Sequence, residues 1–224
     1  MRSALRQSAL RPSVFCRCAV ATLLAVPALL LAGCERNPLV VKRSSCPAVA
    51  VAAYAGDITL FRPGTPQNAP DVANLDAVAT ITNVRDDCAE TAEQFVSRIT
   101  YDVVARRNGA AEARQIVLPV FATVVQAGNV INAKQISNVV VNFAAGQERA
   151  VASGTATASV SRTAAAVPQA ILDKINRKRR AGQVDAATDP MADPEVRAAL
   201  RAASFEVVIG FQLDDRALAY NIAK

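Results

Sequence analysis

The sequence predicts a mainly β protein, a sandwich of two sheets with a short helical insertion before its last strand. Apolar and polar residues alternate from Ser97 to Arg107 and again from Phe205 to Leu213, which is the period of a strand with one buried face. Between Pro168 and Arg180 the apolar residues recur at helical spacing instead. About six to eight short strands joined by turns, the number expected here, are typical of a β-sandwich.

The amino-terminal part of the expected domain is strand-like. Alternating Val49 and Val51 indicate a first strand, and a second is expected from Ile58 to Phe61. Residues 62–71 contain three Pro and one Gly and are predicted to form a loop. Residues 77–84 are rich in Val, Ile and Thr, which strands favour.

A tight hairpin is expected after the strand Ser97–Arg107. Asn108-Gly109 is a strong turn signal, because both central positions of a type I′ turn need a positive φ. The return strand is predicted from Arg114 to Gln126. Pro119 within it indicates an edge strand or a bulge, since Pro has no N–H to donate.

Three further segments are expected to be strands. The first runs from Gln135 to Phe143, and the second, from Gln147 to Arg162, consists of small Ala, Val, Thr and Ser side chains that should pack under something bulkier. Phe205–Leu213 is the cleanest amphipathic strand of the chain. The segment Ala217–Ile222 either adds to that strand or trails from it.

The insertion is predicted at about residues 168–203 and contains two helices. Pro168 suits the first turn of a helix that runs to Arg180, with Gly182 as its stop. Asp193 is the expected N-cap of the second helix, which ends near Ala203. The whole pattern resembles an immunoglobulin- or fibronectin-type sandwich, although the chain lacks the core Trp of immunoglobulin domains.

The first 33 residues have the plan of a secretion signal. Four Arg form a basic n-region, and the apolar run 19–32 is shorter than the roughly 20 residues of a membrane-spanning helix. The signal ends Leu31-Ala32-Gly33-Cys34, an aliphatic residue, two small residues and a Cys. This sequence resembles the lipobox of bacterial lipoproteins, and the chain is similar to the small, Ala-rich lipoproteins of Gram-negative cell envelopes.

The resemblance implies that Cys34 becomes the lipid-bearing first residue of the mature protein. In that class the Cys thiolate takes a diacylglyceryl group, cleavage falls before the Cys, and the new amine is acylated. Two or more acyl chains anchor a protein stably. Glu35 in place of Asp favours the outer membrane, with the protein facing the periplasm. The alternatives are a signal without lipid modification and an uncleaved anchor.

The predicted organisation therefore has three parts. Residues 1–33 are the lipoprotein signal peptide, residues 34–45 are the lipidated N-terminus and a tether, and residues 46–224 are a single sandwich domain. The tether mixes charged residues with Asn, Pro and Ser, and fully extended it reaches roughly 35–40 Å.

Five Cys are present, and two of them are expected to form a disulfide. Cys16 and Cys18 leave with the signal and Cys34 takes the lipid, which leaves Cys46 and Cys88. Because secreted proteins reside in an oxidising compartment, an even remainder favours a disulfide over the alternative of two buried free thiols.

Charge and composition exclude several classes of function. The precursor has a net charge of +6, but four Arg lie in the signal, and the mature part has 21 basic and 19 acidic residues, a net charge of +2. We therefore expect no nucleic-acid partner. The chain has no His, which excludes His-based catalytic triads, Cys–His dyads and His-ligated metal sites.

Other catalytic and cofactor motifs are also missing. There is no Ser-x-x-Lys, no Gly-x-Ser-x-Gly and no pair of Gly two residues apart, so we expect no catalytic residue, cofactor or metal. Carboxylates cluster at Asp86-Asp87, with Glu90 and Glu93, and at Asp214-Asp215. They are interpreted as solvated turns, and the alternatives are a calcium site or a carboxylate-dependent hydrolase.

One local feature stands out as a candidate contact for an anionic partner, the run Arg177, Lys178, Arg179 and Arg180. Basic side chains in such a run bind anionic lipid headgroups, lipopolysaccharide phosphates or an acidic envelope protein. The alternative is a helix C-terminus, where cations complement the helix dipole.

Together these features predict a non-catalytic binding or assembly module, anchored to the membrane through lipid, whose partner the sequence does not name. A purely structural envelope lipoprotein is the second hypothesis.

Replacing Cys34 by Ser is expected to leave an unlipidated, uncleaved precursor, because the thiolate that accepts the diacylglyceryl group is gone. The intact mass of the purified protein and its membrane fractionation measure this. A variant that is processed and fractionates like the wild type would contradict the lipobox interpretation.

Overall fold

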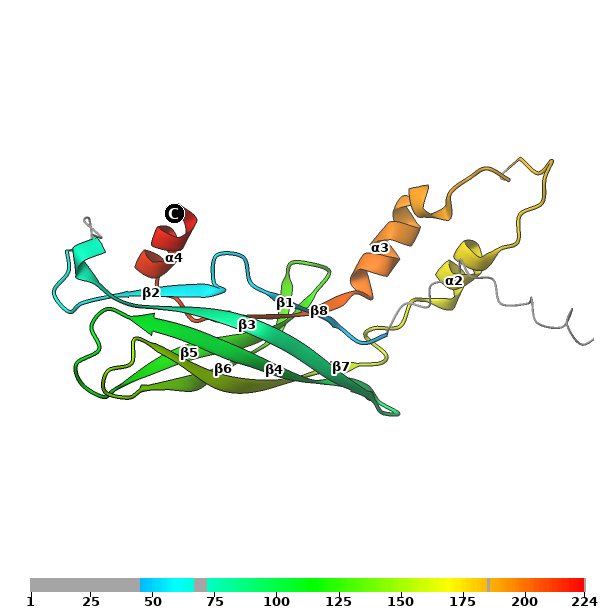
Figure 1. Ribbon diagram of the computed structural model, residues 1–224. Helices are drawn as coiled ribbons and strands as arrows, with labels where there is room; N and C mark the ends of the chain where they lie inside the picture. Colours follow the sequence, from blue (N-terminus) through cyan, green and yellow to red (C-terminus); the bar gives the residue numbers. More distant parts are fainter. Residues whose placement is uncertain (1–44, 67–71, 185, 224) are drawn as a thin grey trace, which may run out of the picture. The chain divides into compact units, whose positions relative to one another are not determined.

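Eight strands in two sheets make up most of the computed structural model, which describes residues 45–66, 72–184 and 186–223 (Figure 1). The prediction of a mainly β protein is confirmed. The strands are β1 Ala48–Val51, β2 Asp57–Phe61, β3 Leu75–Glu90, β4 Gln94–Arg107, β5 Arg114–Gln126, β6 Val130–Phe143, β7 Arg149–Ser161 and β8 Phe205–Phe211. The helices are α2 Gln169–Asn176, α3 Pro194–Ala202 and α4 Asp215–Ala223, with short 3-10 helices η1 Val72–Asn74 and η2 Pro190–Ala192.

The two sheets share one apolar core in a sandwich-like arrangement. One sheet has the order β1-β8-β5-β6 and the other β2-β3-β4-β7, and β1 with β8 is the parallel pair among otherwise antiparallel neighbours. Alternate residues of both sheets turn inward, as the strand period requires. Ile99 and Val103 of β4 and Val207 and Ile209 of β8 are completely buried, so both sheets contribute to the same core.

The small side chains of β7 make room for Tyr101 of β4. Tyr101 and Gly154 are cross-strand partners, and only 1% of Tyr101 is exposed. A Cβ atom on Gly154 would come within 2.4 Å of the Tyr101 ring, so the ring lies directly over the glycine. Burial raises the pKa of the Tyr101 hydroxyl, which has no hydrogen-bond partner among the described residues. The expected packing of the small-residue strand under a bulkier group is confirmed.

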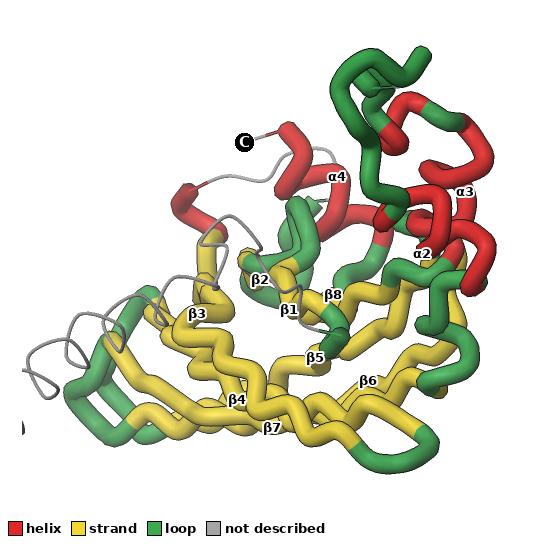
Figure 2. The backbone as a smooth tube through the Cα atoms, turned by 90° about the vertical axis from the view of Figure 1, so that its right-hand side faces the viewer, coloured by secondary structure: helices red, strands yellow, loops and turns green. Residues whose placement is uncertain are grey.

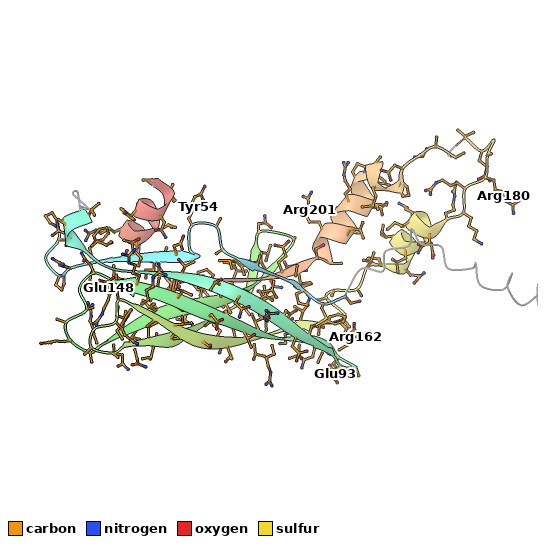
Figure 3. All side chains as sticks on the ribbon, viewed as in Figure 1. Tyr54, Glu93, Glu148, Arg162, Arg180 and Arg201 are labelled. Carbon is orange, nitrogen blue, oxygen red and sulfur yellow. A yellow bond between two sulfur atoms is a disulfide. The ribbon has the colours of Figure 1, made fainter. Side chains whose placement is uncertain are left out.

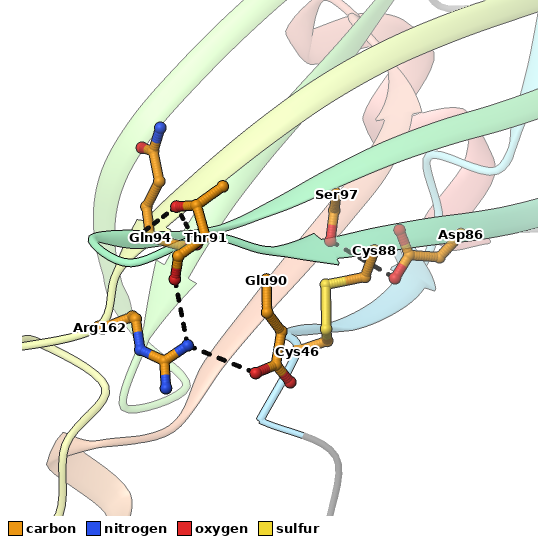
Figure 4. The surroundings of a disulfide bond; sticks show 8 residues. All are labelled: Cys46, Asp86, Cys88, Glu90, Thr91, Gln94, Ser97 and Arg162. Atoms are coloured by element: carbon orange, nitrogen blue, oxygen red, sulfur yellow. Dashed lines mark hydrogen bonds and ion pairs between the residues drawn. A yellow bond between two sulfur atoms is a disulfide. The ribbon is translucent and has the colours of Figure 1, made fainter.

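The disulfide between Cys46 and Cys88 links the two sheets. Cys46 lies two residues before the start of β1, and Cys88 belongs to β3 of the other sheet, with 6.3 Å between their Cα atoms (Figure 4). The predicted pairing is confirmed. The cross-link spans 42 residues of sequence, for which the chain-entropy model gives about 4 kcal/mol of stabilisation.

The predicted hairpin at Asn108-Gly109 is wrong. β4 and β5 lie in different sheets, and of the two turn residues only Gly109 has a positive φ, 91°. The connection is held instead by Arg107, which is 5% exposed and donates through Nε to the Gln147 carbonyl (2.8 Å) and through Nη2 to the Ala144 carbonyl (3.1 Å). The alternation of each strand was evident from the sequence, but alternation does not identify the partner strand.

The position of Pro119 also differs from the prediction. β5 lies between β8 and β6, so it is not an edge strand. The Pro119 carbonyl accepts a hydrogen bond from the Gln212 N–H (2.8 Å), and the ladder between β5 and β8 begins one residue later, at Val120 opposite Phe211. The N–H and C=O of one strand residue point to the same side, so the position where Pro119 lacks an N–H faces the chain that follows β8. No ladder hydrogen bond between β5 and β8 is therefore lost at Pro119.

The last segment forms a helix, α4, which neither of the two sequence-based alternatives included. The Asp214 side chain accepts a hydrogen bond from the Ala217 N–H (2.7 Å) and caps the helix. Asn221, 5% exposed, donates to the carbonyls of Tyr54 (2.7 Å) and Asp57 (2.8 Å) and attaches α4 to the connection between β1 and β2. Single polar anchors of this kind leave no periodic signal in the sequence.

Gly154→Ala is expected to lower the free energy of unfolding by about 1–3 kcal/mol, because the added Cβ overlaps the buried Tyr101 ring. Thermal unfolding measures the loss. Thr155→Ala, a substitution at the adjacent exposed position of β7, is the matched control and should stay within about 0.5 kcal/mol. Equal melting temperatures for the two variants would show that the Tyr101 ring moves aside freely.

Candidate functional site

The helical insertion, α2 and α3, lies at the end of the sandwich where the chain enters the fold. β1 starts beside the first residues of β8, with Ala48 opposite Glu206, and α3 directly precedes β8. In the other sheet, the last residue of β7, Ser161, is opposite Gln94, and α2 follows β7. Figure 3 shows Arg180 and Arg201 of the insertion at the same end as Glu93 and Arg162, and Glu148 at the other.

The two helices are joined by charged side chains. Asp193 caps α3 as predicted, because its side chain accepts a hydrogen bond from the Glu195 N–H (2.8 Å). Lys174 of α2 contacts the Glu195 carboxylate and lies 3.7 Å from the Asp193 carboxylate. The hydrogen bond with Glu195 raises the pKa of Lys174. In Figure 2, α2 and α3 lie together and apart from α4.

The first helix ends earlier than predicted, at Asn176 instead of Arg180. The backbone leaves the helix at Arg177, with φ −56° and ψ 121°, and Gly182 lies in the loop that follows. Short helices are held mainly by burial of an apolar face, and the buried residue of α2 is Ile171. The run of four cations adds no apolar side chain to that face, so the helix stops before it.

Arg179 folds back on the helix that precedes it. Its guanidinium lies 3.4 Å from the Lys174 carbonyl and 3.5 Å from the Arg177 carbonyl, which are hydrogen-bond acceptors at the end of α2. Its Nε is buried, with no hydrogen-bond partner among the residues that the structure describes. Arg179 therefore stabilises the C-terminal end of the helix. The sequence allowed this role, as an alternative, for all four residues of the basic run.

A cavity of about 580 Å³ lies between α2, η2 and α3. Lys174, Arg177 and Arg179 line it together with acidic residues. Two of these acids already accept hydrogen bonds from helix N-termini, Asp189 from the Met191 N–H (2.9 Å) and Asp193 as described above. The lining of the cavity thus mixes basic side chains with carboxylates, two of which cap helices.

Lys178 and Arg180 are exposed on the loop that follows α2. This loop, residues 177–184 and hereafter the basic loop, contains four basic and no acidic residues. Val184 at its end is fully exposed, at 108%. Neither Lys178 nor Arg180 forms an ion pair within the described part of the chain. The predicted cluster therefore divides into a structural residue, Arg179, a residue that lines the cavity, Arg177, and two outward-facing cations.

The carboxylate clusters lie only in part in the solvated turns that were expected, with Glu93 in the β3–β4 turn and Asp214 in the connection before α4. Asp86 and Asp87 lie within β3, so their side chains point to opposite faces of the strand. The Ser97 hydroxyl donates weakly to Asp86 (3.4 Å), and Glu90 lies 3.4 Å from Arg162 (Figure 4). Asp214 caps α4. Among the described residues, no group of three or more His, Cys, Asp or Glu is arranged to hold a metal ion.

Sequence reasoning missed a second cavity, of about 490 Å³, at the other end of the sandwich, between β2, the end of β8 and α4. Arg216 lies 5.6 Å from the Phe61 ring and donates to the Pro66 carbonyl (3.0 Å). The Gln212 Oε1 that lines the cavity is buried without a hydrogen-bond partner among the described residues. These residues come from segments far apart in the sequence, so no local motif predicts the cavity.

The lipobox residues Leu31, Ala32, Gly33 and Cys34 lie outside the described residues. Within the described ranges, every helix is too short or too polar to cross a bilayer. Comparison of the chain with protein-family models, with curated proteins and with solved structures found no match.

Arg179→Ala is expected to raise the opening of α2 about five-fold, equivalent to about 1 kcal/mol, because the contacts with two helix-end carbonyls are lost. Amide hydrogen exchange of residues 169–176 measures this. Lys178→Ala removes the same charge from an exposed position and should leave the exchange rate unchanged. An identical effect of both variants would mean that only the charge matters and not the contacts of Arg179.

Proposed function

We propose that this chain is a lipid-anchored, non-catalytic binding or assembly module of the bacterial cell envelope, held at the outer membrane and facing the periplasm. Leu31-Ala32-Gly33-Cys34 supports the anchor, with the apolar run that precedes it. The Cys46–Cys88 disulfide supports an oxidising compartment, in which such bonds persist.

The observation that carries the proposal is the attachment of the tether to a cross-linked end of the sandwich. Residues 35–45 separate the lipobox Cys34 from Cys46, which is bonded to the opposite sheet. A pull on the tether therefore acts on both sheets and not on the edge strand β1 alone. This arrangement suits a domain that is held at a surface and presents its remaining faces to a partner.

The finer fold assignment, an immunoglobulin- or fibronectin-like sandwich, is part of the proposal. In such sandwiches the second strand neighbours the fifth in one sheet, and the third neighbours the sixth in the other. The neighbouring pairs β4 with β7 and β5 with β8 support an arrangement of this kind. The parallel pairing of β1 with β8 and the helical insertion before β8 are departures from it.

An exposed apolar strip on β5 and β6 supports a binding role. Val117 and Val140 are cross-strand partners, 52% and 40% exposed, and Ile136, opposite Phe121, is 54% exposed. Lys134 covers the Phe121 ring at 5.0 Å. Contiguous exposed apolar side chains with a polar surround are typical of protein-binding surfaces.

Crosslinking of the intact lipoprotein in cells, followed by affinity capture, tests the binding role. Val117→Thr with Val140→Thr should abolish capture of the crosslinked envelope protein while the melting temperature stays unchanged, because both side chains are partly solvated. Val151→Thr is the matched control on β7, at 63% exposure, and should retain the partner. A wild-type protein that yields no crosslinked neighbour would contradict the binding role and favour a purely structural one.

A further inference from the structure

The basic loop belongs to the end of the sandwich from which the tether extends. Cys46 precedes β1, the first residues of β1 pair with the first residues of β8, and α3 leads directly into β8. β7 ends beside the β3–β4 turn that follows Cys88, and α2 is the next helix along the chain. Strand direction alone thus places the insertion and the origin of the tether at one end of the domain.

Lys178 and Arg180 of the basic loop form no ion pair with an acidic residue in the described part of the chain. Glu195 contacts Lys174, and Asp189 and Asp193 accept hydrogen bonds from backbone N–H groups. Lys178 and Arg180 are exposed, and Figure 3 shows Arg180 at the outer extremity of the insertion. Their positive charge is therefore presented to the surroundings and not to the domain.

An apolar side chain accompanies these cations. Val184, at the end of the basic loop, is 108% exposed, and Met191 of η2 is 45% exposed. Isolated exposed apolar residues are common, but here one stands in the same eight-residue loop as four cations. Basic residues beside an exposed apolar residue are the composition that binds at the headgroup level of an anionic bilayer.

We propose that the basic loop is a second membrane contact, in which Lys178 and Arg180 bind anionic phospholipid headgroups and Val184 lies at the headgroup level. This inference rests on the proposed function in one respect, because acylated Cys34 brings the domain to the bilayer. The tether of residues 35–45 spans at most roughly 40 Å, so the loop stays at high effective concentration near the surface. A weak contact is then sufficient to orient the sandwich with β5 and β6 accessible to a partner.

A bilayer fits these observations better than an acidic protein does. An acidic protein partner would need a shaped surface to recognise, whereas Lys178, Arg180 and Val184 are exposed side chains of a loop. Headgroups require only charge and proximity, and each Lys or Arg near an anionic surface strengthens binding about five-fold. The tether supplies the proximity without any further contact.

The absence of Trp from the chain allows a direct test. Val184→Trp places a single indole on the basic loop, and Val151→Trp places one on an exposed site near the start of β7, at the other end of the sandwich. Each acylated full-length product is inserted from micelles into vesicles of phosphatidylcholine alone or with an equal part of phosphatidylglycerol, both containing brominated lipid. Indole emission and its quenching by bromine report contact with the bilayer.

The indole emission of the Val184→Trp protein should shift to shorter wavelength and be quenched in the anionic vesicles at low salt. High salt should reverse both changes. Lys178→Gln with Arg180→Gln in the same background should weaken the contact by roughly 25-fold. Arg106→Gln with Arg149→Gln removes two charges from the other end and should leave the contact unchanged. The emission of the Val151→Trp protein should keep the wavelength of a water-exposed indole in both kinds of vesicle.

Several results would overturn the inference. If the Val184→Trp and Val151→Trp proteins both float with the vesicles but give equal emission, the membrane contact of the basic loop is refuted, whereas the proposed lipid anchor is not. Quenching of Val184→Trp that ignores lipid charge and the loss of Lys178 and Arg180 would remove the role of the cations. A chain that carries no acyl group on Cys34 and does not float would refute the proposed function, and this inference with it.

Discussion

The Cys46–Cys88 disulfide joins the two sheets at the end of the sandwich where the chain enters the fold. β1 has only four residues and borders one sheet, so its pairing with β8 alone would be a weak attachment for whatever precedes Cys46. The covalent bond to β3 transfers that attachment to the longest strand of the opposite sheet. Whatever precedes Cys46 is therefore attached to both sheets through this one link.

The core on which the link acts is built from modest side chains. β7 contributes mainly Ala, Gly and Val to the interior, and Tyr101 fills the space above Gly154. Arg107 closes the opposite end by hydrogen bonds to two loop carbonyls and lies 5.1 Å from the Phe143 ring. The chain has no Trp, and its core is filled in part by Tyr101, which packs over Gly154. The buried guanidinium of Arg107 is satisfied by hydrogen bonds to backbone carbonyls.

The run of like charges in the insertion divides into side chains with different surroundings. Arg179 turns back to the end of α2, whereas Lys178 and Arg180 point outward, although the three are consecutive in an unbroken basic run. Because the helix stops at Asn176, the direction of each of these side chains is set by the irregular backbone that follows and not by helical geometry. The sequence identified the cluster, but its division into a structural and an exposed part follows from the backbone conformation at Arg177.

The sequence by itself predicted most of the strand segments and their buried faces, the pairing of Cys46 with Cys88, and the Asp193 helix cap. Each of these follows from local spacing or from cysteine arithmetic, because burial of one strand face imposes a period of two wherever the strand lies. Only the tertiary structure decided that β4 and β5 belong to different sheets, that Pro119 lies inside a sheet, and that α4 is anchored through Asn221. Partner choice depends on contacts between residues far apart in the chain, and a periodic pattern contains no information about which of several similar strands will supply them.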